Sequence, residues 1–157
     1  MDEIVCATRG GEGSRAVQQA AIDRAKETGK PLVFLYVVSL ESVNISDPQL
    51  EPAVQEELTW MGKALLRIAQ RRAHAANVDA AMVVREGNVA EEITRYLTDH
   101  KASVLLIGAT RDATANVFGD DAVERFAQRI RDSSNVKVEI IHPEPLSQLH
   151  RPGEAHG

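Results

Sequence analysis

The chain has 157 residues, of which 43% are hydrophobic and 26% are charged, the length and composition of one globular domain with an ordinary core. The 18 Lys and Arg residues against 23 Asp and Glu residues leave a net charge of −5, which argues against a nucleic-acid-binding protein. No apolar run approaches the roughly 20 residues that a membrane-spanning helix needs, and the acidic start differs from a secretory signal. We therefore expect a cytoplasmic protein that binds neither membranes nor nucleic acid.

Short apolar runs along the chain predict five strands. Residues 4–8 form the first run, and residues 32–38 (Leu-Val-Phe-Leu-Tyr-Val-Val) give the strongest strand pattern. Further strands are predicted at residues 80–85, 104–107 and 136–141. Uninterrupted apolar runs of this kind are typical of strands that are buried on both faces.

The segments between these runs predict four helices. Ser14 is expected to cap the first helix, which Gly29 ends, and the second follows a polar loop over residues 39–52. Capping-box patterns predict the starts of the third and fourth helices, at Asn88 with Glu91 and at Asp121 with Glu124. Alternating strands and helices indicate a parallel sheet with helices on both faces.

The second helix combines an apolar stripe with a charged face. Spacings of four and three residues predict one buried face, made by Val54, Leu58, Met61, Leu65 and Ile68. Acids near its start and arginines near its end suit the helix dipole, so we interpret the charges as a solvated face. A basic binding patch is the alternative interpretation.

The loop after the first strand has a glycine pattern with two interpretations. Gly11-x-Gly13-x-x-Ala16 fits a loose dinucleotide-binding fingerprint, in which backbone N–H groups at a helix start hold a phosphate. That fingerprint also needs an acid at the end of the second strand, where residues 32–38 contain none. The glycines are also explained by the geometry of a tight turn.

Four segments of the chain form a further pattern: residues 4–14, 35–38, 84–93 (Val-Arg-Glu-Gly-Asn-Val-Ala-Glu-Glu-Ile) and 102–108. In sequence and in order, these segments resemble the universal stress protein family. The resemblance implies an α/β domain over residues 1–142 with a five-stranded, mainly parallel sheet in the order 3-2-1-4-5. Residues 143–157, with three prolines, are expected to be a flexible tail.

The resemblance also implies a nucleotide site, but this sequence departs from the family's ATP-binding motif. ATP-binding members carry Gly-x-x-Gly, nine residues, then Gly followed by Ser or Thr. Here Gly108 is present, Arg111 replaces the second glycine, only seven residues precede Gly119, and Asp120 replaces the hydroxyl residue. Arg9 stands where an Asp would contact adenosine. The predicted altered pocket comprises Thr8, Arg9, Gly10, Val37, Ile107, Gly108, Arg111, Gly119 and Asp120.

Two arginines in this altered pocket leave two hypotheses open. Arg9 and Arg111 form a clamp for a small anionic ligand, a phosphate or a carboxylate, or they form internal ion pairs with Asp112, Asp120 or Asp121. The five histidines and Cys6 show no metal-ligand spacing, and we expect neither a metal nor catalytic residues. Cys6, inside an apolar run, is expected to be a buried hydrophobe.

The resemblance implies a stress-response protein that acts by binding and association, as a homodimer through its last strand. The interface residues are expected to be Val136, Val138 and Ile140, which alternate with charged residues as on an edge strand. ATP binding in the family's usual manner is not expected, and no cofactor is assigned. The alternatives are an ATP- or AMP-binding signalling module and a nucleotide-hydrolysing or nucleotide-transferring enzyme.

Overall fold

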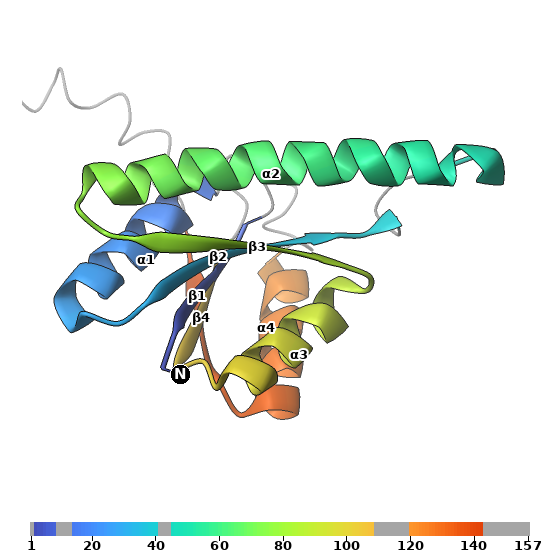
Figure 1. Cartoon of the computed structure of the whole chain (residues 1–157). Helices are drawn as coiled ribbons and strands as arrows, with labels where there is room; N and C mark the ends of the chain where they lie inside the picture. The colour runs from blue at the N-terminus through green and yellow to red at the C-terminus, as the bar shows by residue number, and fades with distance from the viewer. Residues whose placement is uncertain (1, 9–13, 41–44, 109–119, 143–157) are drawn as a thin grey trace, which may run out of the picture.

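The computed structural model describes residues 2–8, 14–40, 45–108 and 120–142. Figure 1 shows its strands as one twisted layer that lies between helices. In chain order the elements are β1 (Ile4–Ala7), α1 (Ser14–Thr28), β2 (Leu32–Val38), the 3-10 helix η2 (Pro48–Leu50), α2 (Glu51–Ala75), β3 (Ala80–Glu86), α3 (Val89–His100), β4 (Val104–Gly108), α4 (Asp120–Ser134) and β5 (Lys137–Ile141). The alternation of strands and helices that the sequence predicts is confirmed.

The sheet is parallel throughout, with the strand order β3-β2-β1-β4-β5. This is the predicted order. The central strand β1 is buried at every position, because helices cover the sheet on both sides. None of the helices in the described ranges is long and apolar enough to cross a membrane.

Each face of the sheet has its own apolar core. Because side chains alternate along a strand, Ile4 and Cys6 of β1 point to one face, and Val5 and Ala7 point to the other. Helices α1 and α2 cover the first face, and α3 and α4 cover the second (Figure 1). The side chains of Phe34, Leu66 and Leu106 fill the first core, and those of Leu35, Leu97 and Ile130 fill the second.

Helix α2 contacts the sheet through a different face from the predicted stripe, so that prediction is wrong in part. Its buried residues are Gly62, Leu66, Ala69 and Ala73, whereas Met61 and Ile68 each remain 47% exposed. A Cβ at Gly62 would lie 2.6 Å from Cε2 of Tyr36, so the helix approaches β2 very closely at this point. The small residues Gly62, Ala69 and Ala73 permit that approach, and Leu66 is the large side chain on this face of α2 that packs into the core.

Several element ends also differ from the predictions. Helix α2 begins at Glu51, inside the segment expected to be a loop, because Pro52 in the first turn lacks only an N–H that needs no helical partner. Strand β1 ends at Ala7 and β5 begins at Lys137, one residue inside their predicted limits. The capping prediction at Asn88 is confirmed: its side chain accepts a 3.0 Å hydrogen bond from the Glu91 N–H.

Candidate functional site

The carboxyl ends of β1 and β4 meet at the point where the chain connections diverge. From β1 the chain crosses to β2 on one side, while β4 lies on the other side of β1. Cys6 lies opposite Leu106, so two residues further on Thr8 reaches the level of Gly108. Ligands of open parallel sheets bind at such a switch point. Thr8 and Gly108 are therefore the two predicted site residues that the described structure brings together.

Thr8 places a buried hydroxyl group at this edge. The residue is 2% exposed, and its N–H donates a 2.8 Å hydrogen bond to the Leu35 carbonyl. Its Oγ1 has no hydrogen-bond partner of ordinary geometry within the described ranges. An unsatisfied buried hydroxyl destabilises a fold by about 1–3 kcal/mol. This atom is a candidate contact for a polar ligand.

The Cys6 thiol lies beneath this edge, on the same face of β1 as Thr8. Burial raises the pKa of Cys6 to about 12, and the nearby Thr8 hydroxyl only partly opposes that shift. The thiol is therefore protonated at neutral pH. Because the thiolate is the nucleophilic form, Cys6 is a core residue and not a reactive group.

The side chains of two predicted site residues lie in the core. Ile107 is 6% exposed and packs in the core beneath α3 and α4, where Val37 also packs. Arg9, Gly10, Arg111 and Gly119 lie outside the described residues, and Asp120 is described only as the first residue of α4. The arginine clamp and its ion-pair alternative both stay predictions.

Sequence analysis missed one polar residue at the same edge. Ser39 directly follows β2 and is 7% exposed, although the sequence places it at the start of a polar loop. Its position immediately after the strongest strand pattern is the signal that could have found it. In a parallel sheet the residue after a strand lies at the carboxyl edge.

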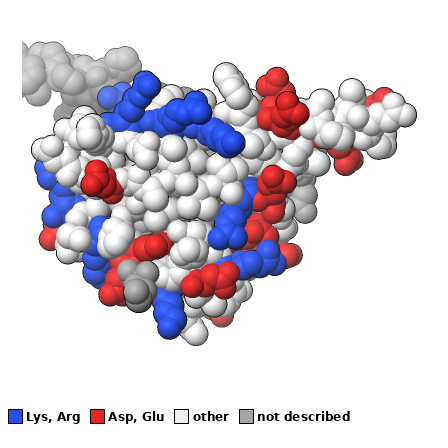
Figure 2. Space-filling model, in the orientation of Figure 1, with Lys and Arg blue, Asp and Glu red and all other residues white. Residues whose placement is uncertain are grey.

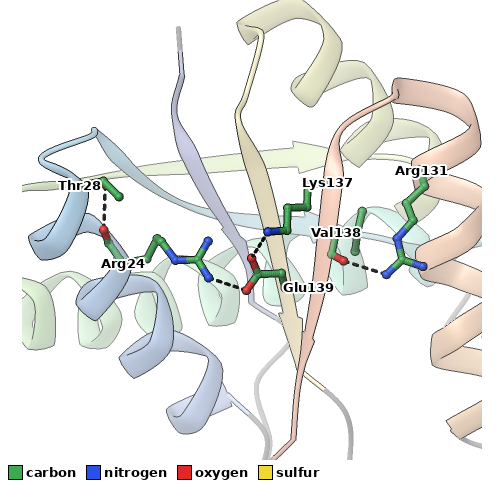
Figure 3. Close-up of polar contacts among 6 residues, drawn as sticks. All are labelled: Arg24, Thr28, Arg131, Lys137, Val138 and Glu139. Carbon is green, nitrogen blue, oxygen red and sulfur yellow. Dashed lines mark hydrogen bonds and ion pairs between the residues drawn. The ribbon is translucent and has the colours of Figure 1, made fainter.

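Strand β5, the predicted dimer interface, lies at the edge of the sheet. One of its backbone carbonyl groups already accepts a hydrogen bond from a side chain of the same chain. Figure 3 shows the guanidinium group of Arg131, from α4, reaching β5 on the side away from β4. Its Nη2 donates a 2.8 Å hydrogen bond to the Val138 carbonyl. The Val138 side chain is 3% exposed, and Val136 and Ile140 pack partly against the same core. Side chains and one carbonyl of the expected interface therefore have partners within the chain.

Charged side chains tie β5 to α1 on the opposite face. Arg24 Nη2 lies 2.6 Å from Glu139 Oε1, and Lys137 Nζ lies 3.4 Å from Glu139 Oε2 (Figure 3). The hydrogen bond from Arg24 is the main reason why the pKa of Glu139 is lowered, against the opposing effect of burial. Glu139 therefore stays ionised and joins the first helix to the last strand.

A second polar cluster ties α3 to the start of the sheet. The Tyr96 hydroxyl donates a 3.0 Å hydrogen bond to Glu3 Oε1, and its ring stacks on His100 with centroids 4.0 Å apart. Burial, followed by this bond to Glu3, raises the pKa of Tyr96. The cluster anchors α3 structurally. In the part of the chain that the structure describes, no group of acidic, His and Cys residues has the arrangement of a metal site.

Comparisons with known proteins agree with this topology. The model of the universal stress protein family matches residues 1–142. A protein of that family from Burkholderia pseudomallei has 22% identity, covers 89% of this chain and 95% of its own, and has a TM-score of 0.69. A universal stress protein in complex with cAMP has 20% identity, coverages of 91% and 98%, and a TM-score of 0.66.

A third similar structure is a universal stress protein family protein from Arabidopsis thaliana with AMP bound. It has 11% identity, covers 98% of this chain and 99% of its own, and has a TM-score of 0.65. A search of curated proteins finds no match. At these identities the solved structures establish the shared fold, while the family model spans all five strands and four α-helices. The chain belongs to the universal stress protein family.

Proposed function

We propose that this protein is a cytoplasmic stress-response protein that acts by binding and association rather than by catalysis. We also propose that it does not hold ATP in the manner of the family's ATP-binding members. The observation that carries this proposal is the presence of Arg111 and Asp120 where the family's ATP-binding motif has a glycine and a Ser or Thr. Glycine lets a phosphate approach the backbone closely, whereas the side chain of an arginine hinders that approach. An Asp beside a triphosphate adds like-charge repulsion that a Ser or Thr would not.

A second candidate function is binding of a mononucleotide such as AMP. The buried Thr8 hydroxyl, which has the Cys6 thiol near it but no partner of ordinary hydrogen-bond geometry among the described residues, favours it because a polar ligand at the switch point would satisfy that group. Universal stress proteins in complex with cAMP and with AMP bound share this fold. A monophosphate carries less negative charge than a triphosphate, so Asp120 repels it less. Arg9 and Arg111 supply the cations to pair with it.

Calorimetric titration with ATP, AMP and cAMP at near-physiological salt tests both candidates. We expect ATP to bind more weakly than about 100 μM, which corresponds to roughly −5.5 kcal/mol. Tighter ATP binding would contradict the main proposal. AMP binding tighter than this limit, lost in Arg111→Ala but kept in the control Arg125→Ala on the exposed side of α4, supports the second candidate.

Self-association through the last strand stays part of the proposal. Pairing of two β5 strands through their outer edges requires Arg131 to release the Val138 carbonyl. Charged side chains that cover an edge strand are a common protection against such pairing.

A further inference from the structure

Helix α2 exposes a row of apolar side chains across the middle of its outer face. Trp60, Ala64 and Ile68 follow one another at intervals of four residues, away from the buried residues of the helix. Trp60 is 66% exposed and Ile68 is 47% exposed. The small Ala64 between them leaves space for a side chain of another molecule. Large apolar side chains that lie together on a surface mark an interaction site, whereas single ones do not.

A row of basic side chains runs beside the apolar row. Lys63, Arg67 and Arg71 are exposed and also repeat at intervals of four residues. Each follows an apolar residue of the first row by three positions, and residues three apart are neighbours on a helix surface. Figure 2 shows Lys and Arg side chains gathered over one half of α2. The two rows extend over residues 60–71, which make about three helical turns.

Helix α2 does not neutralise its own basic row. The positions three and four residues away from each of these cations hold only neutral or basic residues, so no acid of the helix lies next to them. The ion pairs found within the described ranges do not include Lys63, Arg67 or Arg71. Cations at this spacing also repel one another. The row therefore exposes positive charge that an external anion can neutralise.

We propose that α2 binds a short, acidic, amphipathic helix of another protein through both rows. Apolar side chains of that helix cover Trp60 and Ile68, and Asp or Glu side chains in its neighbouring row pair with the basic row of α2. Rows with a spacing of four residues are the ridges by which helices most often pack against each other. A partner segment of about 11–15 residues is long enough to cover both rows.

The acidic start of α2 argues for a compact partner. Glu56 and Glu57 are exposed about one turn before Trp60, and the whole chain carries a net charge of −5. An anionic membrane lying against the outer face would meet these acids together with the basic row, and a nucleic acid would leave the apolar row uncovered. A short helix covers residues 60–71 alone. The charge distribution therefore favours a protein segment over an extended polyanion.

A synthetic peptide with one leucine row and one adjacent glutamate row tests this surface. Trp60 is the chain's single tryptophan, so its fluorescence reports binding at this face directly. A tryptophan-free helical peptide of about 18 residues should shift the emission to shorter wavelength in a saturable titration. A peptide of the same composition in scrambled order should bind about tenfold more weakly or less, because it forms neither row.

Reversal of the basic row separates a specific charge contact from a change in folding. Lys63→Glu with Arg67→Glu and Arg71→Glu should weaken binding of the glutamate peptide about tenfold or more, since three exposed ion pairs are lost. A peptide with lysines in place of the glutamates should bind this variant more tightly than it binds the wild type. Such an exchange of preference cannot come from a change in folding.

Two further variants separate the apolar contact from the charges and control for the charge change. Ile68→Ser should weaken peptide binding by the same factor in low and in high salt, since it removes only an apolar contact. Arg125→Glu with Arg129→Glu, which reverses two exposed arginines of the same spacing on α4, should leave binding unchanged. Circular dichroism and thermal unfolding establish that every variant is folded.

Several results would overturn the proposal. They are the absence of a saturable shift, equal binding of the scrambled peptide, and unchanged binding in the triple charge-reversal variant. A tighter response of Trp60 to phosphatidylserine vesicles or to a DNA duplex than to the peptide assigns the face to a membrane or to nucleic acid instead. A shift that follows protein concentration without peptide assigns it to a second copy. The inference rests on the proposed role in association, but the ATP titration does not involve these rows, so either proposal can fail without the other.

Discussion

At the scale of single residues, Thr8 and Gly62 show how packing decides what a side chain does. Thr8 directly follows the central strand β1, which has a neighbouring strand on each side. The residue is therefore buried, and its hydroxyl cannot reach water. Gly62 lies so close to the Tyr36 ring that any side chain there would displace it. Neither property follows from the residue type, because each depends on an element that is distant in the sequence.

The unpartnered hydroxyl predicts an unusual effect of Thr8→Val. In the absence of ligand this nearly isosteric change should raise the free energy of unfolding by about 1 kcal/mol, because it removes a buried polar atom without opening a cavity. Urea unfolding measures the change, with Thr8→Ser as the control that keeps the hydroxyl. A loss of stability in Thr8→Val would mean that the hydroxyl is satisfied, and would remove Thr8 as a candidate ligand contact.

At the scale of elements, the last strand illustrates the limit of pattern analysis. The alternation of Val136, Val138 and Ile140 with charged residues correctly indicates an edge strand. The pattern does not show that Arg131 donates to the strand's outer side, or that Arg24 holds Glu139 from α1. Both contacts join residues on different elements, and both alter how readily β5 can pair with another strand.

The Arg24–Glu139 pair predicts a pH-dependent contribution to stability. Since the pKa of Glu139 is lowered from its ordinary 4.5 in the folded state, its stabilising effect is present above that value and is lost as the pH falls through the lowered pKa. Glu139→Gln should cost about 1 kcal/mol at pH 7, and the difference from wild type should vanish in acid. Chemical unfolding over this pH range measures it.

The matched control for this prediction is Glu27→Gln, an exposed carboxylate that influences Arg24 only through space. Its effect should be a few tenths of a kcal/mol at most. Equal losses for the two variants, or a Glu139→Gln difference that persists in acid, would assign the effect to something other than the ion pair.

At the scale of the whole molecule, the two apolar cores make the centre of the sheet inaccessible. Cys6 is fully buried in the core beneath α1 and α2, and because burial raises its pKa to about 12 the thiol is protonated at pH 8. Alkylation of Cys6 should therefore require unfolding of the sheet, and its rate should rise with urea in step with global unfolding. Fast alkylation without urea would show that β1 opens locally.

An introduced thiol provides the reference rate for that measurement. Ala75→Cys places a cysteine on the exposed end of α2, where it should react at the rate of a free thiol in the native protein. The ratio between the two rates then measures the protection that the core gives Cys6.

The sequence by itself determined the succession of strands and helices, the buried central strand and the Asn88 cap, because these depend on neighbours a few residues apart. Resemblance in four segments determined the family, and with it the strand order. Only the tertiary structure decided which side of α2 faces the sheet, because the close approach at Gly62 depends on Tyr36 from another element. It likewise left Trp60 exposed and Thr8 without a described partner. Contacts between distant segments set these properties, and hydrophobic periodicity along one segment carries no information about them.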